Sequence, residues 1–293
     1  CACLVGSEMC IRDSNNTVFF QSTGSTILAL HQILVVEREN TQNIQLTVEN
    51  LEKYYGGSEK LNATLKDGAG NPIANKTITF TINGQKYNRT TNSNGIASLA
   101  INLRPGVYDV TTMYGNMSVY SKVVVKTTIE GKDLVKMYQN GTQFFATFLG
   151  TDGKPLANNT KVTFNINGVF YTRQTNENGV VGLNINLRPG NYIITTMFDG
   201  LAIGNNINVL PTLVTNDLSM KYLDGSKFTA QTLDGQGNPL ANQNVSFNIN
   251  GVLYHRVTDK DGMASLNIRL MSGDYIITSY WNDFQVGNTI KID

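Results

Sequence analysis

Residues 70–95 read GNPIANKTITFTINGQKYNRTTNSNG, and this stretch decides the fold. Its middle part alternates apolar and polar residues, with Ile78, Phe80 and Ile82 two positions apart, which predicts a β-strand with one buried face. Asn83-Gly84 follows at once. An Asn-Gly pair between two alternating runs predicts a type I′ hairpin, because both residues tolerate a positive φ angle. The stretch therefore predicts a β-hairpin of an all-β protein.

The same pattern occurs three times along the chain. Its Gly-x-Pro segment recurs at Pro72, Pro155 and Pro239, at spacings of 83 and then 84 residues. Each copy continues through an Asn-Gly hairpin, a T-[ND]-x-[ND]-G turn, a further alternating strand and a Gly-x-Tyr element. The last spacing is typical of a tyrosine corner, in which the tyrosine hydroxyl bonds to the backbone a few residues upstream. The residues that we assign to these turns and corners are Asn83, Gly84, Tyr108, Asn167, Gly168, Tyr192, Asn250, Gly251 and Tyr275.

Short strands separated by turns every eight to twelve residues or so, without helical periodicity, predict a β-sandwich for each repeat. We expect the three repeats at 41–126, 127–211 and 212–293, with very short joints between them. Residues 15–40 do not match the repeat, and we assign them to the tail of a preceding segment or to disorder. Residues 1–14, CACLVGSEMCIRDS, resemble a sequencing adapter translated in frame, because back-translation of residues 3–14 matches such an adapter at every codon. We therefore exclude 1–14 from the fold as an artefact.

Composition excludes several classes of function. Cys1, Cys3 and Cys10 all lie in the adapter-like segment, so the repeats can form neither a disulfide framework nor a thiolate metal site. A disulfide or metal pair of Cys3 with Cys10 is the weaker alternative. A net charge of +1 with 15% charged residues argues against a basic face for nucleic acid. No apolar run reaches the roughly eighteen residues that cross a bilayer, so we expect no membrane insertion within this sequence.

Taken together, the Gly-x-Pro, Asn-Gly-x-x-Tyr-x-Arg, Thr-[Asn/Asp]-x-[Asn/Asp]-Gly and Pro-Gly-x-Tyr elements of residues 41–293 resemble the bacterial Ig-like repeats of prokaryotic surface proteins, the invasin and intimin type. They look closest to adhesin-like proteins of methanogenic archaea. The resemblance implies three tandem immunoglobulin-like β-sandwich domains in an elongated array. It also implies an extracellular protein of the cell surface or cell wall that mediates or projects attachment to a cell-surface protein or glycan on another cell. It supplies no catalytic or cofactor-binding residue, and we expect a monomer that is not an enzyme.

The residues themselves offer little chemistry. No nucleophile with a base, no carboxylate pair and no metal cluster recurs in the repeats. Asp259-Lys-Asp261-Gly262 resembles half of a calcium loop without the acidic twelfth position, so we prefer a tight turn and keep calcium as a minor alternative. We expect His255 to be a strand residue that points to solvent. We expect Trp281 to be an aromatic at the edge of the core, rather than a platform for a sugar.

Three further patterns leave alternatives open. Arg89, Arg173 and Arg256 each follow a tyrosine by two residues, and we prefer stacking on that tyrosine or pairing with a carboxylate at a sheet edge over ligand binding. A covalent bond from Lys136 or Lys221 to Asn205 or Asn288 is a weak prediction, because Ser121 replaces the asparagine in the first repeat. Sequons for N-glycosylation stand at Asn15, Asn62, Asn75, Asn88, Asn116, Asn140, Asn158 and Asn244.

Two other functions compete with the adhesive stalk. An array of carbohydrate-binding modules would require an exposed aromatic ring at the same position of every repeat. The other hypothesis is that the repeats are spacers of a surface enzyme whose catalytic domain lies elsewhere.

Overall fold

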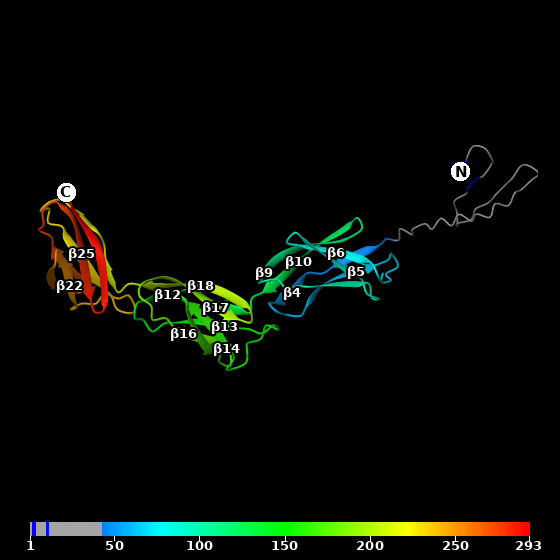
Figure 1. The fold of residues 1–293 in the computed structure, drawn as a ribbon, viewed down its shortest axis with the longest axis horizontal. Helices are drawn as coiled ribbons and strands as arrows, with labels where there is room; N and C mark the ends of the chain where they lie inside the picture. Colours follow the sequence, from blue (N-terminus) through cyan, green and yellow to red (C-terminus); the bar gives the residue numbers. More distant parts are fainter. Residues whose placement is uncertain (1, 4–9, 12–42) are drawn as a thin grey trace, which may run out of the picture. The chain divides into compact units, whose positions relative to one another are not determined.

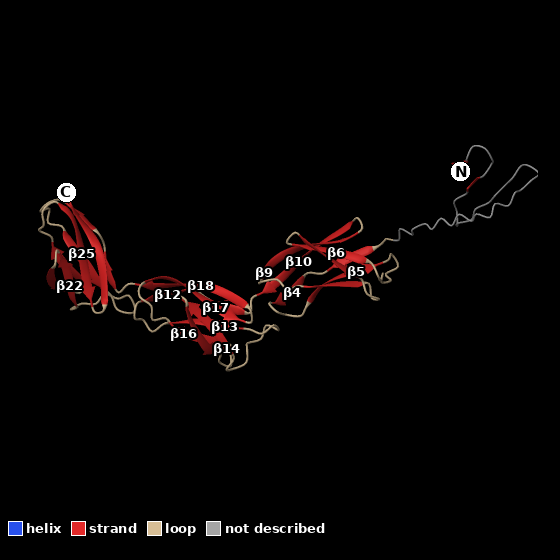
Figure 2. Ribbon diagram, in the orientation of Figure 1, coloured by secondary structure: helices blue, strands red, loops and turns tan. Residues whose placement is uncertain are grey.

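The computed structural model describes residues 2–3, 10–11 and 43–293. Throughout these residues every regular element is a β-strand (Figure 2). Two short strands, β1 (Ala2–Cys3) and β2 (Cys10–Ile11), pair in antiparallel fashion and place Cys3 opposite Cys10. The rest of segments 1–14 and 15–40, which the sequence assigns to an adapter and a tail, lies outside the described residues. Gln45–Asp293 is a separate unit and contains all three repeats.

Repeat 1 is a sandwich of two sheets (Figure 1). The three-stranded sheet has the order β3-β5-β8 and the five-stranded sheet has the order β4-β10-β9-β6-β7. All pairs are antiparallel except β4 with β10, which are parallel. The strands are β3 (Gln45–Val48), β4 (Leu51–Tyr54), β5 (Lys60–Lys66), β6 (Thr77–Ile82), β7 (Gln85–Thr90), β8 (Ile96–Ala100), β9 (Gly106–Tyr114) and β10 (Met117–Lys126).

Repeats 2 and 3 have the same topology as repeat 1. Their sheets are β11-β13-β16 with β12-β18-β17-β14-β15, and β19-β21-β24 with β20-β26-β25-β22-β23. The strands of repeat 2 are β11 (Ile129–Gly131), β12 (Leu134–Met137), β13 (Gln143–Phe148), β14 (Lys161–Ile166), β15 (Val169–Gln174), β16 (Val180–Asn184), β17 (Gly190–Phe198) and β18 (Leu201–Leu210). Those of repeat 3 are β19 (Leu213–Thr215), β20 (Leu218–Met220), β21 (Lys227–Thr232), β22 (Asn244–Ile249), β23 (Val252–Val257), β24 (Met263–Asn267), β25 (Gly273–Trp281) and β26 (Phe284–Ile292).

The alternation seen in the sequence builds the core between the two sheets. Every second residue of β6, β14 and β22 is buried, and Phe80, Phe164 and Phe247 at their centres are fully enclosed. In repeats 2 and 3 these central rings meet further phenylalanines edge to face, as Phe247 meets Phe228 at 5.7 Å between ring centroids. Burial of one such ring stabilises a domain by roughly 2–3 kcal/mol. The prediction of all-β, tandem immunoglobulin-like sandwiches is confirmed.

A split first strand distinguishes this sandwich from a simple meander. In repeat 1 the chain runs as β3 in the small sheet, bends at Glu49 and Asn50, and continues as β4 in the large sheet. The first and last strands of the repeat therefore lie side by side.

No helix among the described residues is long and apolar enough to cross a membrane.

Candidate functional site

The predicted Asn-Gly turns hold the backbone in the left-handed region. Asn83 and Gly84 have φ angles of 50° and 74°, and the pairs at 167–168 and 250–251 are within a few degrees of these values. A Cβ on Gly84, Gly168 or Gly251 would meet no atom within 4 Å. Glycine is thus needed there for its backbone freedom and not for space.

The three predicted corner tyrosines share one hydrogen bond. The hydroxyls of Tyr108, Tyr192 and Tyr275 donate to the backbone carbonyl four residues upstream, at 2.8, 2.8 and 2.9 Å. The third copy keeps the bond although serine replaces the proline of the other two. These residues tie the loop between the sheets to the start of β9, β17 and β25, which is a structural task.

In the turn that resembles a calcium loop, the first carboxylate accepts hydrogen bonds from backbone amides. Asp259 Oδ1 accepts hydrogen bonds from the amides of Asp261 and Met263, both at 2.9 Å, as Asn92 and Asn176 do in the other repeats. No group of three or more His, Cys, Asp or Glu side chains in the described residues is arranged to hold a metal ion.

His255 and Trp281 could have bound a ligand, but their surroundings indicate structural roles. His255 is exposed on β23, and its Nδ1 lies 2.8 Å from the Ser246 hydroxyl on the neighbouring strand. Trp281 is 8% exposed and packs in the core of repeat 3, so its ring is not a platform for a sugar.

The recurring arginines cap an open sheet edge. The guanidinium Nη1 of Arg89, Arg173 and Arg256 donates to the carbonyl of the residue before it, at 2.7, 2.9 and 2.7 Å. These carbonyls belong to Asn88, Thr172 and His255. In a two-residue hairpin the two residues that flank the turn form a hydrogen-bonded pair, and hydrogen-bonded and non-hydrogen-bonded pairs alternate from there along the two strands. By this alternation the three residues lie in non-hydrogen-bonded pairs, so their carbonyls face away from the partner strand. Stacking on the tyrosine is confirmed for Arg173, whose guanidinium carbon lies 5.7 Å from the centroid of the Tyr171 ring.

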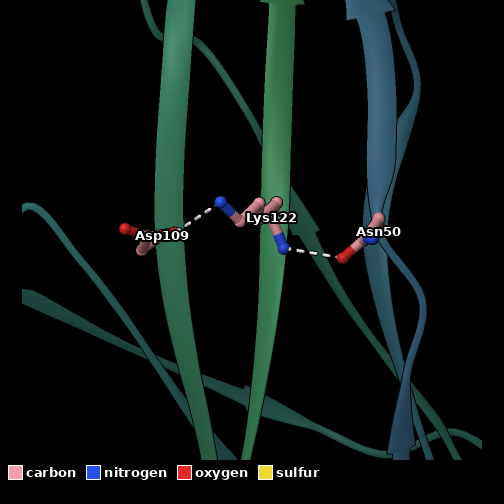
Figure 3. Close-up of polar contacts among 3 residues, drawn as sticks. All are labelled: Asn50, Asp109 and Lys122. Carbon is pink, nitrogen blue, oxygen red and sulfur yellow. Dashed lines mark hydrogen bonds and ion pairs between the residues drawn. The ribbon is translucent and has the colours of Figure 1, made fainter.

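An amide or carboxylate locks the bend of the split first strand. In repeat 1 the Asn50 side chain accepts a hydrogen bond from the Lys122 amide at 2.8 Å, while the Lys122 ammonium faces Asp109 at 3.8 Å (Figure 3). Asp133 takes the place of Asn50 in repeat 2 and accepts from the Asn206 backbone amide at 2.8 Å and its side chain at 2.9 Å. These bonds lower the pKa of Asp133.

Asp217 occupies the same position in repeat 3. It accepts from the Thr289 amide at 2.9 Å and from the Asn288 side chain at 3.1 Å, and these bonds lower the pKa of its carboxyl. The exposed carboxylates of both repeats therefore serve the fold of the last strand.

The structure contradicts the predicted bond from a lysine to an asparagine. Lys136 pairs with Val209, four residues beyond Asn205, which places the two about 13 Å apart along the strand. The Lys136 ammonium is buried and donates to the carbonyls of Asn140, Thr142 and Ile185, and this burial lowers its pKa. The Asn205 side chain instead donates to Gly131 O at 3.1 Å.

In repeat 3 the same offset separates the other candidate pair. Met220 pairs with Ile292, four residues beyond Asn288, and Lys221 follows Met220 as an exposed residue. The prediction was wrong because the parallel register of first and last strand is not visible in the sequence.

The most exposed aromatic rings do not recur at one position, and where tyrosine recurs on β7, β15 and β23, Tyr87 is 37% exposed while Tyr171 and Tyr254 are half-buried. Tyr120, Phe145 and Phe170 are 77, 55 and 66% exposed. The equivalent residues of the other repeats are not aromatic: Gly204 and Gly287, Asn62 and Thr229, Lys86 and Leu253. The sequon residues 62, 75, 88, 116, 158 and 244 are exposed, whereas Asn140 is partly covered and its Nδ2 donates to Gly235 O; Asn15 lies outside the described residues.

A tyrosine that sequence analysis missed lies at the joint between repeats 2 and 3. Tyr138 follows β12, and its ring packs against Phe284 with 5.7 Å between centroids. Its hydroxyl donates to Asp283 Oδ2 at 3.1 Å, and the neighbouring Gln139 side chain donates to Asp283 Oδ1 at 3.2 Å. The joint thus brings the loop after β12 to the hairpin turn between β25 and β26.

The joint between repeats 1 and 2 uses the equivalent elements. Tyr55, which follows β4, packs against the core of repeat 2, and a Cβ on Gly200 in the turn between β17 and β18 would lie 3.7 Å from its hydroxyl. The Tyr54 ring lies on Gly153 of the Gly-x-Pro segment, as Met137 lies on Gly237 in the next joint. The recurrence of tyrosine at 55, 138 and 222 is the signal in the sequence that could have revealed this surface.

Comparisons with known proteins give a likeness of fold only. No protein-family model and no curated protein matches the sequence. Among solved structures, the I9–I11 tandem of titin aligns at 13% identity and a TM-score of 0.31, covering 85% of this chain and 98% of that one. Invasin, described as a bacterial integrin-binding protein, aligns at 18% identity and a TM-score of 0.26, over 85% of this chain and 60% of invasin.

A third similar structure is a Ca²⁺-stabilised adhesin that helps an Antarctic bacterium reach out and bind ice. It aligns at 14% identity and a TM-score of 0.22, over 85% of this chain and 74% of the adhesin. At identities and TM-scores this low, the three likenesses carry no argument about what this chain does.

Proposed function

We propose that the chain is a stalk segment of an adhesin-like protein at the cell surface, without catalytic activity or cofactor. Its sandwiches set a fixed spacing and project a site of attachment. The observation that carries this proposal is the repetition of one joint, in which a tyrosine loop contacts the Gly-x-Pro segment and last hairpin of the next repeat. Spacing by serial units needs such a contact between each unit and its neighbour.

Four further features are proposed from the resemblance of the sequence motifs. They are the extracellular location, the attachment to a protein or glycan of another cell, the monomeric state and the closeness to archaeal adhesin-like proteins. The alternative of spacers in a surface enzyme has the same architecture and differs only in what the stalk carries.

Electron spin resonance on the full chain tests the fixed spacing. Spin labels are attached at Ser118→Cys in repeat 1 and Gln285→Cys in repeat 3, after Cys1, Cys3 and Cys10 have been changed to serine. A stalk with docked repeats gives a narrow distribution of distances between the labels. A broad distribution that resembles a flexible linker would contradict the proposal.

A groove in repeat 2 favours a second candidate, contact with a glycan. It has a volume of about 420 Å³ and is lined by exposed Phe145 with Glu130, Lys132 and Asp133. The equivalent groove of repeat 1, of about 390 Å³, has Asn62 in place of the phenylalanine. Saturable binding of the full chain to a glycan array, lost on Phe145→Ser but kept on Phe170→Ser, would support this function. Binding unaffected by Phe145→Ser would count against the groove.

A further inference from the structure

We infer that the end of repeat 3 formed by Tyr222, Leu223 and Met271 is a docking surface for another sandwich repeat placed in series. We call these three residues the distal patch. Tyr222 and Leu223 follow β20, and Met271 precedes β25. Met220 and Gly273 both pair with Ile292, from opposite sides, so the two loops leave the sheet at the same end.

The distal patch is apolar and uncovered. Tyr222, Leu223 and Met271 are 47, 59 and 69% exposed, and each is a large hydrophobic residue. The positions of Leu223 and Met271 are polar or glycine elsewhere: Gln139 and Gly56 stand for the leucine, and Arg188 and Arg104 for the methionine. Adjacent exposed apolar side chains of this size are typical of an interaction surface.

The backbone of the patch supports the same conclusion. Leu223 has a φ of 55°, in the left-handed region that a bulky side chain rarely adopts. Gly56 and Gln139 share this conformation, at 75° and 60°, in the two joints that are occupied. Repeat 3 thus keeps the loop conformation of a joint at a steric cost to leucine, while nothing in the described residues covers it.

The occupant follows from the two joints already formed. Tyr55, Tyr138 and Tyr222 are placed alike, because the amide of each donates to the carbonyl that ends its own repeat: Lys126, Leu210 and Asp293, at 2.9, 2.8 and 3.0 Å. In repeats 1 and 2 this tyrosine contacts the next sandwich. The partner that fits Tyr222 is therefore a sandwich with a Gly-x-Pro segment and a last hairpin turn like those of repeats 2 and 3. This inference does not depend on adhesion and goes beyond it.

Extension of the chain tests the inference. A copy of repeat 2, residues 127–210, is added directly after Asp293 of the full chain. It reproduces the spacing between repeats 1 and 2, supplies a Gly-x-Pro segment and a last hairpin turn, and leaves 221–224 and 270–272 present only once. Amide hydrogen exchange is then compared between the original and the extended chain. We expect exchange in 221–224 and 270–272 to slow by about tenfold when the added repeat docks.

Two variants of the extended chain make the result specific. Tyr222→Ser with Leu223→Gly should abolish the protection, while Tyr120→Ser, which removes an exposed ring from a sheet face, should leave it unchanged. Tryptophan fluorescence of Trp281 in the original chain shows that repeat 3 still folds when it carries Tyr222→Ser with Leu223→Gly. Unchanged exchange in the extended chain would overturn the inference. Association of the original chain in sedimentation, abolished by Tyr222→Ser, would also overturn it in favour of a second copy as the occupant.

Discussion

Thr112, Thr196 and Ser279 occupy one equivalent, fully buried position, and no protein atom in the described part of the chain bonds to any of the three hydroxyls. A buried hydroxyl that has lost water without gaining a partner destabilises the folded state. We expect Thr196→Val to raise the free energy of unfolding by about 1 kcal/mol, measured by urea unfolding. Thr195→Val, on the outer face of the same strand, is the control. A destabilised Thr196→Val protein would mean that the hydroxyl has a bonded partner.

The carboxylates that lock the bend make stability depend on acid pH. The pKa of Asp133 and of Asp217 is lowered from the ordinary value of 3.8 by the hydrogen bonds they accept. Their contribution is therefore fully present above about pH 4 and is lost as the pH falls through the folded pKa. Asn50 performs the same task in repeat 1 without titrating.

We expect the double variant Asp133→Asn and Asp217→Asn to lose less stability than the unmodified chain between about pH 4 and pH 2.5. The measurement is the urea midpoint at each pH. Both proteins keep their other carboxylates, so the difference between them isolates the two bends. Parallel curves would refute the role of these carboxylates.

At the scale of the element, two glycines distinguish the stability cost of backbone strain from the cost of a steric clash. Gly168 and Gly179 have φ angles of 77° and 69°, but a Cβ on Gly168 meets open space while one on Gly179 would lie 2.5 Å from Phe148 O. We expect Gly168→Ala to cost about 1 kcal/mol of unfolding free energy, and Gly179→Ala at least about 2 kcal/mol more. Thermal unfolding of the two variants checks this order, and equal losses would contradict it.

The outer strands β7, β15 and β23 are open edges that the arginines protect. An unpaired row of amides and carbonyls is a template for pairing with another chain. We expect the triple variant Arg89→Ser, Arg173→Ser and Arg256→Ser to self-associate in sedimentation velocity at concentrations where the unmodified chain does not. The matched control is Lys60→Ser, Lys161→Ser and Lys227→Ser, which removes the same charge from exposed positions on the inner strands β5, β14 and β21. Equal behaviour of the two triple variants would show that charge, and not the edge, is responsible.

At this scale the sequence predicted the elements that depend on neighbouring residues, but not those that depend on pairing between distant strands. The alternation around Phe80 and the Asn83-Gly84 turn depend on neighbours in sequence, so a hairpin with one buried face could be predicted. The split into β3 and β4 depends on the parallel partner β10, about seventy residues away, and four-residue strands have too few alternations to identify. The same lack of register information led to the wrong pairing of Lys136 with Asn205.

For the whole molecule, the joints should couple the stability of neighbouring repeats. Because serial repeats gain part of their stability from the next unit, loss of a joint residue weakens both. We expect Tyr138→Ser, a change in repeat 2, to lower the unfolding midpoint reported by Trp281, the single tryptophan, which lies in repeat 3. A fall of about 4–8 °C in a repeat of this size corresponds to a joint worth about 1 kcal/mol. Tyr120→Ser should leave the midpoint unchanged, and a Tyr138→Ser protein with an unshifted midpoint would rule out coupling.

The parallel pairing of first and last strands has a mechanical consequence. In each repeat the split first strand begins as β3, β11 or β19 and continues as β4, β12 or β20, and the chain leaves at the far end of β10, β18 or β26, the parallel neighbour of that second half. A pull on the two chain ends therefore acts along these strands in opposite directions and loads their interstrand hydrogen bonds in shear, all together instead of one after another. Each repeat should resist extension up to a threshold force and then yield at once, so stretching single molecules should give one rupture peak for every repeat.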